Sequence, residues 1–152
     1  MARILGIDYG DKRIGFAASD TLGWTAQGMC TYERKGEKRD MEFIFGLVEQ
    51  YDINQIVIGM PRNMNGTYGP RAEIVRKFGE LLSQHVLRPI TYWDERLTTS
   101  AVEKVLIEAD MSRKKRKQVV DKLAAVTILQ NYLDYKNNFN KEAGNNGRKS
   151  NE

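Results

Sequence analysis

The sequence is poor in the residues that build disulfide-rich proteins and cysteine-bound metal sites. Its 152 residues include one cysteine, Cys30, and one histidine, His85. A single cysteine cannot form an internal disulfide framework, and it cannot supply a cage of thiolates for a metal ion. His85 falls late in a predicted helix, where we expect it to lie on the surface. These shortages exclude disulfide scaffolds and Cys-based zinc sites.

Long apolar runs are also missing. No stretch approaches the roughly 20 apolar residues of a membrane-spanning helix, and no signal-peptide pattern opens the chain. With 41% hydrophobic and 29% charged residues, the composition is that of an ordinary soluble protein. The length fits one domain with a real hydrophobic core. We therefore expect a cytoplasmic location and no membrane partner.

Short β-forming runs and helical stripes alternate along the chain and predict an α/β fold. A run that ends in Asp8, together with residues 13–19 and 25–32, predicts a three-strand antiparallel meander. Further strands are expected at 53–60 and 89–93, and helices at 40–51, 70–86, 98–109 and 119–133. This order predicts a mixed five-stranded sheet, with two parallel strands beside the meander and helices on both faces.

The composition changes from about residue 136 onward. Asn, Lys, Gly and Glu dominate there, and no apolar face is available to pack against a core. Such segments stay disordered because they cannot offset the entropy of ordering. We therefore predict one domain over 1–135 and a disordered tail over 136–152.

Three carboxylates stand out by position. Asp8 ends the first predicted strand, Glu95 ends the last, and Asp121 lies early in the final helix. Asp121 shares a helix face with Ala124 and Ala125, and two such small residues would let the helix approach the sheet closely. In open α/β sheets, ligands bind outside the carboxyl ends of the strands. The three acids are therefore expected to converge there.

Converging carboxylates repel one another unless cations neutralise them, and carboxylate oxygens suit Mg²⁺ or Mn²⁺. Two such ions would activate a water and stabilise the leaving oxygen of a phosphodiester. Each acid also has a separate explanation. Asp8 can be a turn residue, Glu95 a partner of Arg96, and Asp121 a helix-start charge that the dipole favours.

Basic and amide side chains near the predicted strand ends could bind a phosphate backbone, because arginine can grip phosphate in a bidentate manner. The run 113–117 places five positive charges in five residues, although a solvated loop explains it too. The candidate nucleic-acid-binding residues are Lys12, Arg13, Arg62, Asn63, Arg96, Arg113, Lys114, Lys115, Arg116 and Lys117.

Four motifs occur in order and at suitable distances. They are Gly6–Gly10 with Arg13–Gly15, Val57–Pro61 with the loop 63–66, Asp94–Thr98, and Asp121–Ala125. Together they resemble the YqgF family, bacterial proteins described as Holliday junction resolvases and as nucleases that mature the 5′ end of pre-16S ribosomal RNA. The resemblance covers residues 3 to 135.

The resemblance implies a ribonuclease-H-like fold and a metal-binding acidic site at Asp8, Glu95 and Asp121. It implies a nuclease, with precursor ribosomal RNA favoured as substrate, branched DNA as the alternative, and the small ribosomal subunit as a candidate partner. A junction resolvase should act as a dimer, since two symmetric cuts need two sites. The sequence itself does not reveal an oligomeric state.

Two other functions compete with the nuclease hypothesis. Gly6–Gly10 also resembles the first phosphate loop of actin-like ATPases and sugar kinases, but those need a second lobe for which 152 residues leave no room. A non-catalytic nucleic-acid-binding module of the same fold is the better rival. Retention of all three acids argues against that module, because negative charge weakens phosphate binding.

Overall fold

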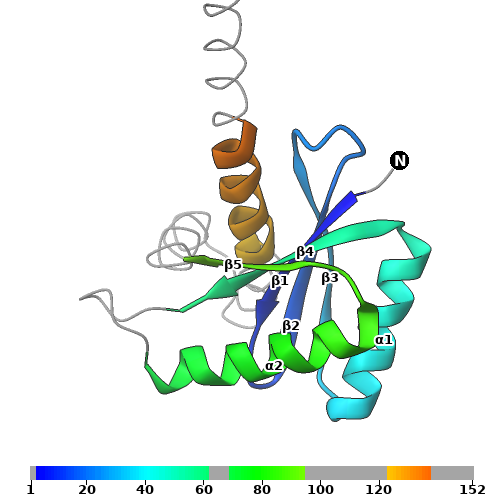
Figure 1. Ribbon diagram of the computed structural model, residues 1–152, viewed down its shortest axis with the longest axis vertical. Coiled ribbons are helices and arrows are strands. Elements are labelled where there is room, and N and C mark those ends of the chain that lie inside the picture. Colours follow the sequence, from blue (N-terminus) through cyan, green and yellow to red (C-terminus); the bar gives the residue numbers. More distant parts are fainter. Residues whose placement is uncertain (1–2, 62–68, 95–122, 138–152) are drawn as a thin grey trace, which may run out of the picture.

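The computed structural model describes residues 3–61, 69–94 and 123–137. Five strands form one sheet: β1 (Arg3–Tyr9), β2 (Arg13–Ser19), β3 (Ala26–Glu33), β4 (Ile53–Met60) and β5 (Ile90–Asp94). Their spatial order is β3-β2-β1-β4-β5. Neighbours β1, β2 and β3 pair antiparallel, whereas β4 runs parallel to both β1 and β5. The predicted meander with two added parallel strands is confirmed (Figure 1).

Helices cover both faces of this sheet. Helices α1 (Glu37–Gln50) and α2 (Pro70–Val86) pack on one face, where they share a large core with alternate residues of the strands. The helix formed by residues 123–137, here called the C-terminal helix, packs on the opposite face around a smaller core. Three layers result, as the pattern of strands and helices predicted.

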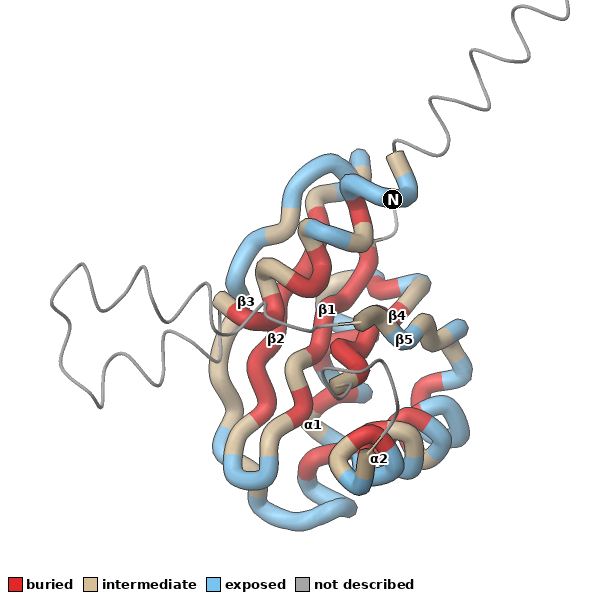
Figure 2. The backbone as a smooth tube through the Cα atoms, turned by 90° about the vertical axis from the view of Figure 1, so that its left-hand side faces the viewer, coloured by how far each residue is buried: buried red, intermediate tan, exposed pale blue. Residues whose placement is uncertain are grey.

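The central strands are buried on both faces (Figure 2). In β1, Leu5 and Ile7 point toward α1 and α2, whereas Ile4 joins the core under the C-terminal helix. In β4, Val57 lies under the C-terminal helix and Ile58 faces the other way. Near-continuous apolar runs are typical of strands that are buried on both faces, which explains why β1 and β4 could be predicted from the sequence.

Several expected boundaries are confirmed to the residue, namely those of β2, β4 and α2. Helix α1 differs, because it begins at Glu37 rather than at the expected residue 40. The Asp40 backbone N–H already donates to the Gly36 carbonyl, so the helix starts earlier. Glu37 and Asp40 both fall in its first turn, where the helix dipole favours negative charge.

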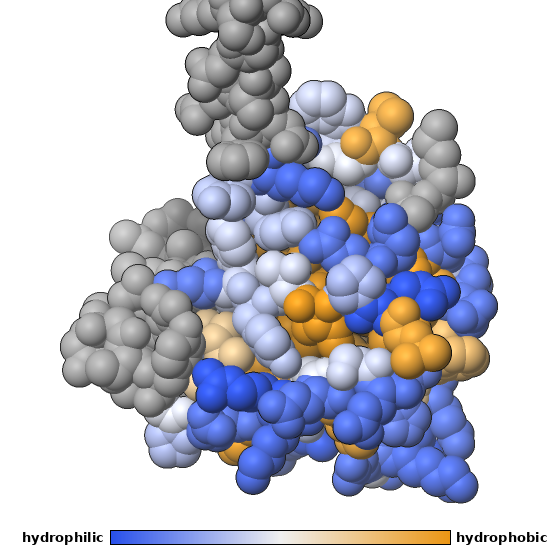
Figure 3. Space-filling view, viewed as in Figure 1, coloured by the Kyte–Doolittle hydropathy of each residue, from blue (hydrophilic) through white to orange (hydrophobic). Residues whose placement is uncertain are grey.

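The part of the described surface that faces the viewer in Figure 3 is mostly hydrophilic. Polar and charged residues cover most of the exposed side of α2, and the larger apolar patches lie above it (Figure 3). His85 of α2 is exposed, as expected, and its Nδ1 lies 2.9 Å from the Leu81 carbonyl oxygen. Across the described ranges, no helix is long and apolar enough to cross a membrane.

Candidate active site

Asp8 lies one residue before the end of β1 and is paired with Gly15 of β2. Its neighbours Ile7 and Tyr9 both belong to the core shared with α1 and α2. Successive side chains of a strand point to opposite faces, so Asp8 projects from the face that the C-terminal helix covers. Asp8 is half-buried there. The acid expected at the carboxyl end of the first strand is therefore at that end.

The C-terminal helix approaches β1 closely beside this acid. A Cβ atom added to Gly6 would lie 2.8 Å from the Leu129 Cβ and 3.2 Å from the Ala125 carbonyl oxygen. Ala124 and Ala125 are both fully buried. The close approach predicted from these two alanines is confirmed, and Gly6 provides the matching space on the sheet.

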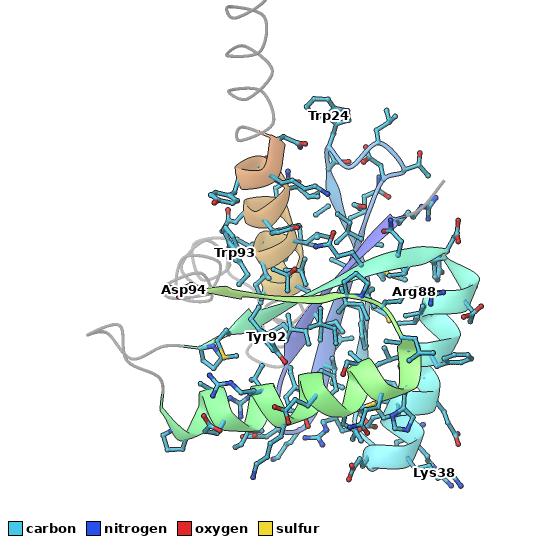
Figure 4. The ribbon with its side chains drawn as sticks, viewed as in Figure 1. Trp24, Lys38, Arg88, Tyr92, Trp93 and Asp94 are labelled. Atoms are coloured by element: carbon cyan, nitrogen blue, oxygen red, sulfur yellow. The ribbon has the colours of Figure 1, made fainter. Side chains whose placement is uncertain are left out.

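Strands β1, β4 and β5 run parallel, so their carboxyl ends meet at one edge of the sheet. At the end of β5, Trp93 and Tyr92 point to opposite sides of the strand (Figure 4). Trp93 packs against the core under the C-terminal helix, with its ring centroid 5.7 Å from that of Tyr132. By the same alternation, Asp94 projects from the α2 side. Asp94 and Asp8 therefore project from opposite faces of the sheet.

The turn that follows Asp8 carries two of the predicted phosphate-binding residues, Lys12 and Arg13. Gly10 donates its backbone N–H to the Arg13 carbonyl at 2.9 Å, and a Cβ on Gly10 would lie 2.5 Å from that oxygen. The turn is therefore tight enough to require glycine. By strand alternation, Arg13 projects from the same face as Asp8, because Ile14 belongs to the opposite core.

A cleft of about 390 Å³ opens beside this turn. The side chains that line it combine three cationic groups with two acidic ones, so the cleft carries a net positive charge. They are Asp11, Lys12, Arg13, Glu33 and Arg34. Lys12 and Arg13, which are neighbours in the sequence, both line this cleft at the end of the sheet where β1 ends.

Two arginines that sequence reasoning missed also reach this turn. Arg34 Nη1 donates to the carbonyl oxygens of Asp11, at 3.2 Å, and Gly10, at 3.5 Å. Arg71 Nη2 donates to the Tyr9 carbonyl at 2.9 Å, and Arg71 Nη1 pairs with the Asp11 carboxylate. In sequence they differ in no way from solvated arginines, so no local signal could have distinguished them.

Burial raises the pKa of Tyr9, which follows Asp8, and the neighbouring Arg34 guanidinium partly opposes this rise. The phenol therefore stays neutral at neutral pH. Its ring stacks on Phe78 of α2, with centroids 4.0 Å apart. Tyr9 thus anchors the end of β1 in the core on one face, while Asp8 projects from the other.

The remaining predicted site residues lie outside the described residues. Within the described ranges, no group of three or more His, Cys, Asp or Glu side chains could hold a metal ion. Two of the three expected metal ligands fall in the segment 95–122, so the described part contains one of them, Asp8. The predicted residues outside the described ranges are Glu95, Asp121, Arg62, Asn63, Arg96, Arg113, Lys114, Lys115, Arg116 and Lys117.

The family model and the relatives that match this chain span nearly all of the described residues. Residues 2–135 match the model of the family RuvX, described as "Holliday junction resolvase". A relative from Heliobacterium modesticaldum is 60% identical over 134 residues, which cover 88% of this chain and 90% of the relative. One from Clostridioides difficile is 53% identical over 136 residues, which cover 90% and 96%. Both are named "Putative pre-16S rRNA nuclease".

Solved structures with the same fold are much more distant in sequence. Thermus thermophilus RuvC in complex with a Holliday junction substrate superposes with a TM-score of 0.56 at 10% identity, covering 90% of this chain and 96% of that one. The fowlpox virus Holliday junction resolvase gives 0.52 at 14% identity, covering 88% and 99%. These likenesses establish the fold that the two structures share with this chain.

Proposed function

The chain belongs to the RuvX family, and from this premise we propose that it is a metal-dependent nuclease that matures the 5′ end of pre-16S ribosomal RNA. Nuclease and resolvase are both names for proteins that cut phosphodiester bonds. Family membership also argues against the kinase-like interpretation of Gly6–Gly10. The observation that carries the proposal is Asp8, a half-buried carboxylate at the carboxyl end of a central strand, beside a closely packed helix.

The described neighbours of Glu95 and Asp121 support a shared site with Asp8. Trp93 projects toward the C-terminal helix, and in an extended strand the residue two positions later shares its face. Asp121 precedes Ala124 and Ala125 by three and four residues, the spacing of one helix face. Ala125 packs on the sheet face from which Asp8 projects, and Ala124 is fully buried beside it in the sequence. We therefore propose Asp8, Glu95 and Asp121 as catalytic metal ligands.

An all-carboxylate donor set suits Mg²⁺ or Mn²⁺ rather than a softer metal. When bound in a pair, these ions supply an activated water and stabilise charge on the leaving oxygen. Asp8, Glu95 and Asp121 would hold these ions. Lys12 or Arg96 would stabilise negative charge on the phosphate. Hydrolysis would leave a 5′-phosphate and a 3′-hydroxyl.

The proposed path of the nucleic acid begins at the turn after β1. Lys12 and Arg13 line the cleft beside that turn, and Arg13 projects from the same sheet face as Asp8. We propose that both contact the phosphate backbone near the cut. Further phosphate contacts are assigned to a larger set of residues, namely Arg62, Asn63, Arg96, Arg113, Lys114, Lys115, Arg116 and Lys117.

A Holliday junction is the second candidate substrate. The family description and the structures of the same fold name this DNA, whereas the curated relatives above 50% identity name pre-16S ribosomal RNA. We favour the RNA because those relatives are far closer in sequence. We propose the small ribosomal subunit as the context in which this precursor is presented.

The test offers the purified protein precursor 16S RNA, an unrelated single-stranded RNA and a four-way DNA junction, each with Mg²⁺ or Mn²⁺. We expect cleavage at the 5′ end of the precursor. Asp8→Asn should lower the rate at least about 100-fold, since even substitutions around metal ligands cost 10–100-fold. Asp52→Asn is the matched control, because Asp52 is exposed and its φ of 55° is a conformation that asparagine tolerates.

The outcomes separate the three candidate functions. Cleavage of the junction with the RNA left intact would replace the RNA nuclease by the resolvase. Binding without cleavage, on every substrate including assembled subunits and with either metal, would favour the non-catalytic module. Equal cleavage by the wild type and Asp8→Asn would remove Asp8 from the catalytic site.

A further inference from the structure

The turn after Asp8 is held from the far side of the sheet by two arginines. Arg71 comes from the first turn of α2, and Arg34 comes from the connection between β3 and α1. Arg71 binds the Tyr9 carbonyl and the Asp11 carboxylate, and Arg34 binds the carbonyls of Gly10 and Asp11. Three successive residues of one turn are thereby fixed by side chains from two other elements.

Arg34 is itself held by a buried carboxylate. Asp40 of α1 is 1% exposed, and it is the one charged side chain among the described residues that is buried. Its Oδ2 accepts a hydrogen bond from Arg34 Nε at 3.1 Å, and its Oδ1 accepts one from the Lys35 N–H at 2.9 Å. Burying a carboxylate is costly unless it is paired and hydrogen-bonded. Asp40 meets both conditions, because it is paired with Arg34 and accepts two hydrogen bonds. The same ion pair orients Arg34 toward the turn.

The ring of Tyr9, like its carbonyl, is in contact with residues from other elements. One face stacks on Phe78 at 4.0 Å, and the guanidinium carbon of Arg34 lies 4.7 Å from the ring centroid. A cation near an aromatic ring adds electrostatic attraction to this packing. The residue after Asp8 is therefore fixed through its side chain and its backbone at once.

We infer that Arg34 and Arg71 are positioning residues, which form a clamp that fixes the backbone on the carboxyl side of Asp8. The inference rests on the proposed function, because it assigns the clamp the task of holding Asp8 in the geometry needed to bind a metal ion. Metal-binding side chains must be held within about 0.5 Å of the geometry that binds the ion, and the surrounding residues must hold them there. Neither arginine belongs to the sheet face from which Asp8 projects, so the clamp would act through the backbone of the turn.

The alternative role for these arginines is direct contact with the phosphate backbone. Arg34 lines the cleft beside the turn, so charge alone does not exclude that role. The two roles predict different measurements. A phosphate contact contributes to substrate binding and its salt dependence, whereas a positioning residue contributes to metal affinity and to the turnover rate.

The test compares Arg71→Gln with Arg76→Gln, in the full-length protein. Arg76 lies on the same helix in an exposed ion pair with Glu73, so its loss matches the charge change without touching the turn. We expect Arg71→Gln to lower kcat and Mn²⁺ affinity by about 10–100-fold, with KM and Tm close to those of Arg76→Gln. Arg71→Lys should restore only part of the loss, because lysine lacks the planar fork that reaches both partners.

Hydrogen exchange gives a readout that needs neither substrate nor metal. The Gly10 amide is bonded to the Arg13 carbonyl inside the clamped turn, so its exchange should accelerate in Arg71→Gln and not in Arg76→Gln. Arg34→Gln alone would leave Asp40 buried and unpaired. The double variant Arg34→Gln/Asp40→Asn removes both charges and should show the same accelerated exchange and weakened Mn²⁺ binding.

The failures are distinguishable. A raised KM and a shallower salt dependence, with Gly10 exchange and Mn²⁺ affinity unchanged, would show that the arginines are phosphate contacts and would overturn the clamp. Unchanged values in all of these measurements would overturn it as well. A wild type that neither binds Mn²⁺ nor cleaves would contradict the proposed function, and it would remove the catalytic purpose of the clamp even if Gly10 exchange responds.

Discussion

The two faces of the sheet are covered in different ways. On one face, α1 and α2 pack on the sheet through large, fully buried side chains, such as Phe16 of β2, Ile44 of α1 and Leu82 of α2. On the other, one helix packs over a smaller core, and Gly6 and Ala125 bring it close to β1. The first arrangement buries more apolar area, which is the main source of stability. The second places the backbone of the C-terminal helix close to β1, on the sheet face from which Asp8 projects.

This difference indicates a division of roles between the faces. The face under α1 and α2 supplies the main core and, through Arg34 and Arg71, the contacts that hold the turn after Asp8. The opposite face has a thinner core and carries the candidate site. Substitutions that are equal in size but placed on different faces should therefore have different effects on function.

The largest expected effect is on stability, from Leu129→Ala on one face and Leu82→Ala on the other. Both side chains are fully buried, so each variant should lose about 2–5 kcal/mol of unfolding free energy in urea titrations. Leu129→Ala should also weaken Mn²⁺ binding, because it loosens the helix that we propose to carry Asp121. The division of roles would be wrong if Leu82→Ala weakened Mn²⁺ binding as much.

Gly6→Ala should have the next largest effect. The new Cβ would meet the Leu129 Cβ at 2.8 Å, an atom close to the helix backbone that cannot move aside, so we expect a loss of about 1–3 kcal/mol. Gly79→Ala is the matched variant on the α2 side. Its Cβ would meet the hydroxyl of Tyr92, a half-exposed side chain whose end can shift, and alanine favours the helix by about 1 kcal/mol. Thermal unfolding should show a smaller loss for Gly79→Ala.

Gln130→Ala tests how polar contacts hold the C-terminal helix. Gln130 Oε1 accepts from the Ala26 N–H at 2.8 Å, and its Nε2 donates to the Trp24 carbonyl at 3.0 Å. Losing these bonds should lower the unfolding free energy by about 1–2 kcal/mol. Asn131→Ala, at the exposed neighbouring position, is the control and should be near neutral. Equal values for both variants would show that packing alone holds this helix.

The smallest expected effect is a pH dependence of the loop that joins β2 and β3. The Trp24 backbone N–H donates to the Asp20 carboxylate and lowers the pKa of Asp20 below its ordinary value of 3.8. A lowered folded-state pKa stabilises the loop above the unfolded value, and this stabilisation is lost as pH falls through the folded value. A carboxyl NMR titration of Asp20 should show the low pKa. An unshifted titration would contradict this expectation. The Trp24 amide signal should change as Asp20 titrates, and Asp20→Asn should abolish that pH dependence.

Much of the fold was predictable because local patterns and tertiary contacts agree. Residues 53–60 form an apolar run that Pro61 ends, and Pro70 begins a helix whose stripe continues to Val86; both elements match the structure. The start of α1 was wrong by three residues, because its first turn is charged and lacks an apolar stripe. The C-terminal helix is still helical at residue 137, beyond the expected Leu133, because the exposed residues 134–136 also carry no apolar stripe.

By itself, the sequence determined the mixed sheet, the position of Asp8 at the end of a buried strand, and the small residues that let a helix approach it. These follow from local periodicity and side-chain size. Only the tertiary structure decided that Asp94 and Asp8 project from opposite faces, and that Arg34 and Arg71 converge on one turn. The physical reason is that a salt bridge or hydrogen bond between distant residues leaves no periodic pattern in the chain, because its partners meet only after the elements have packed.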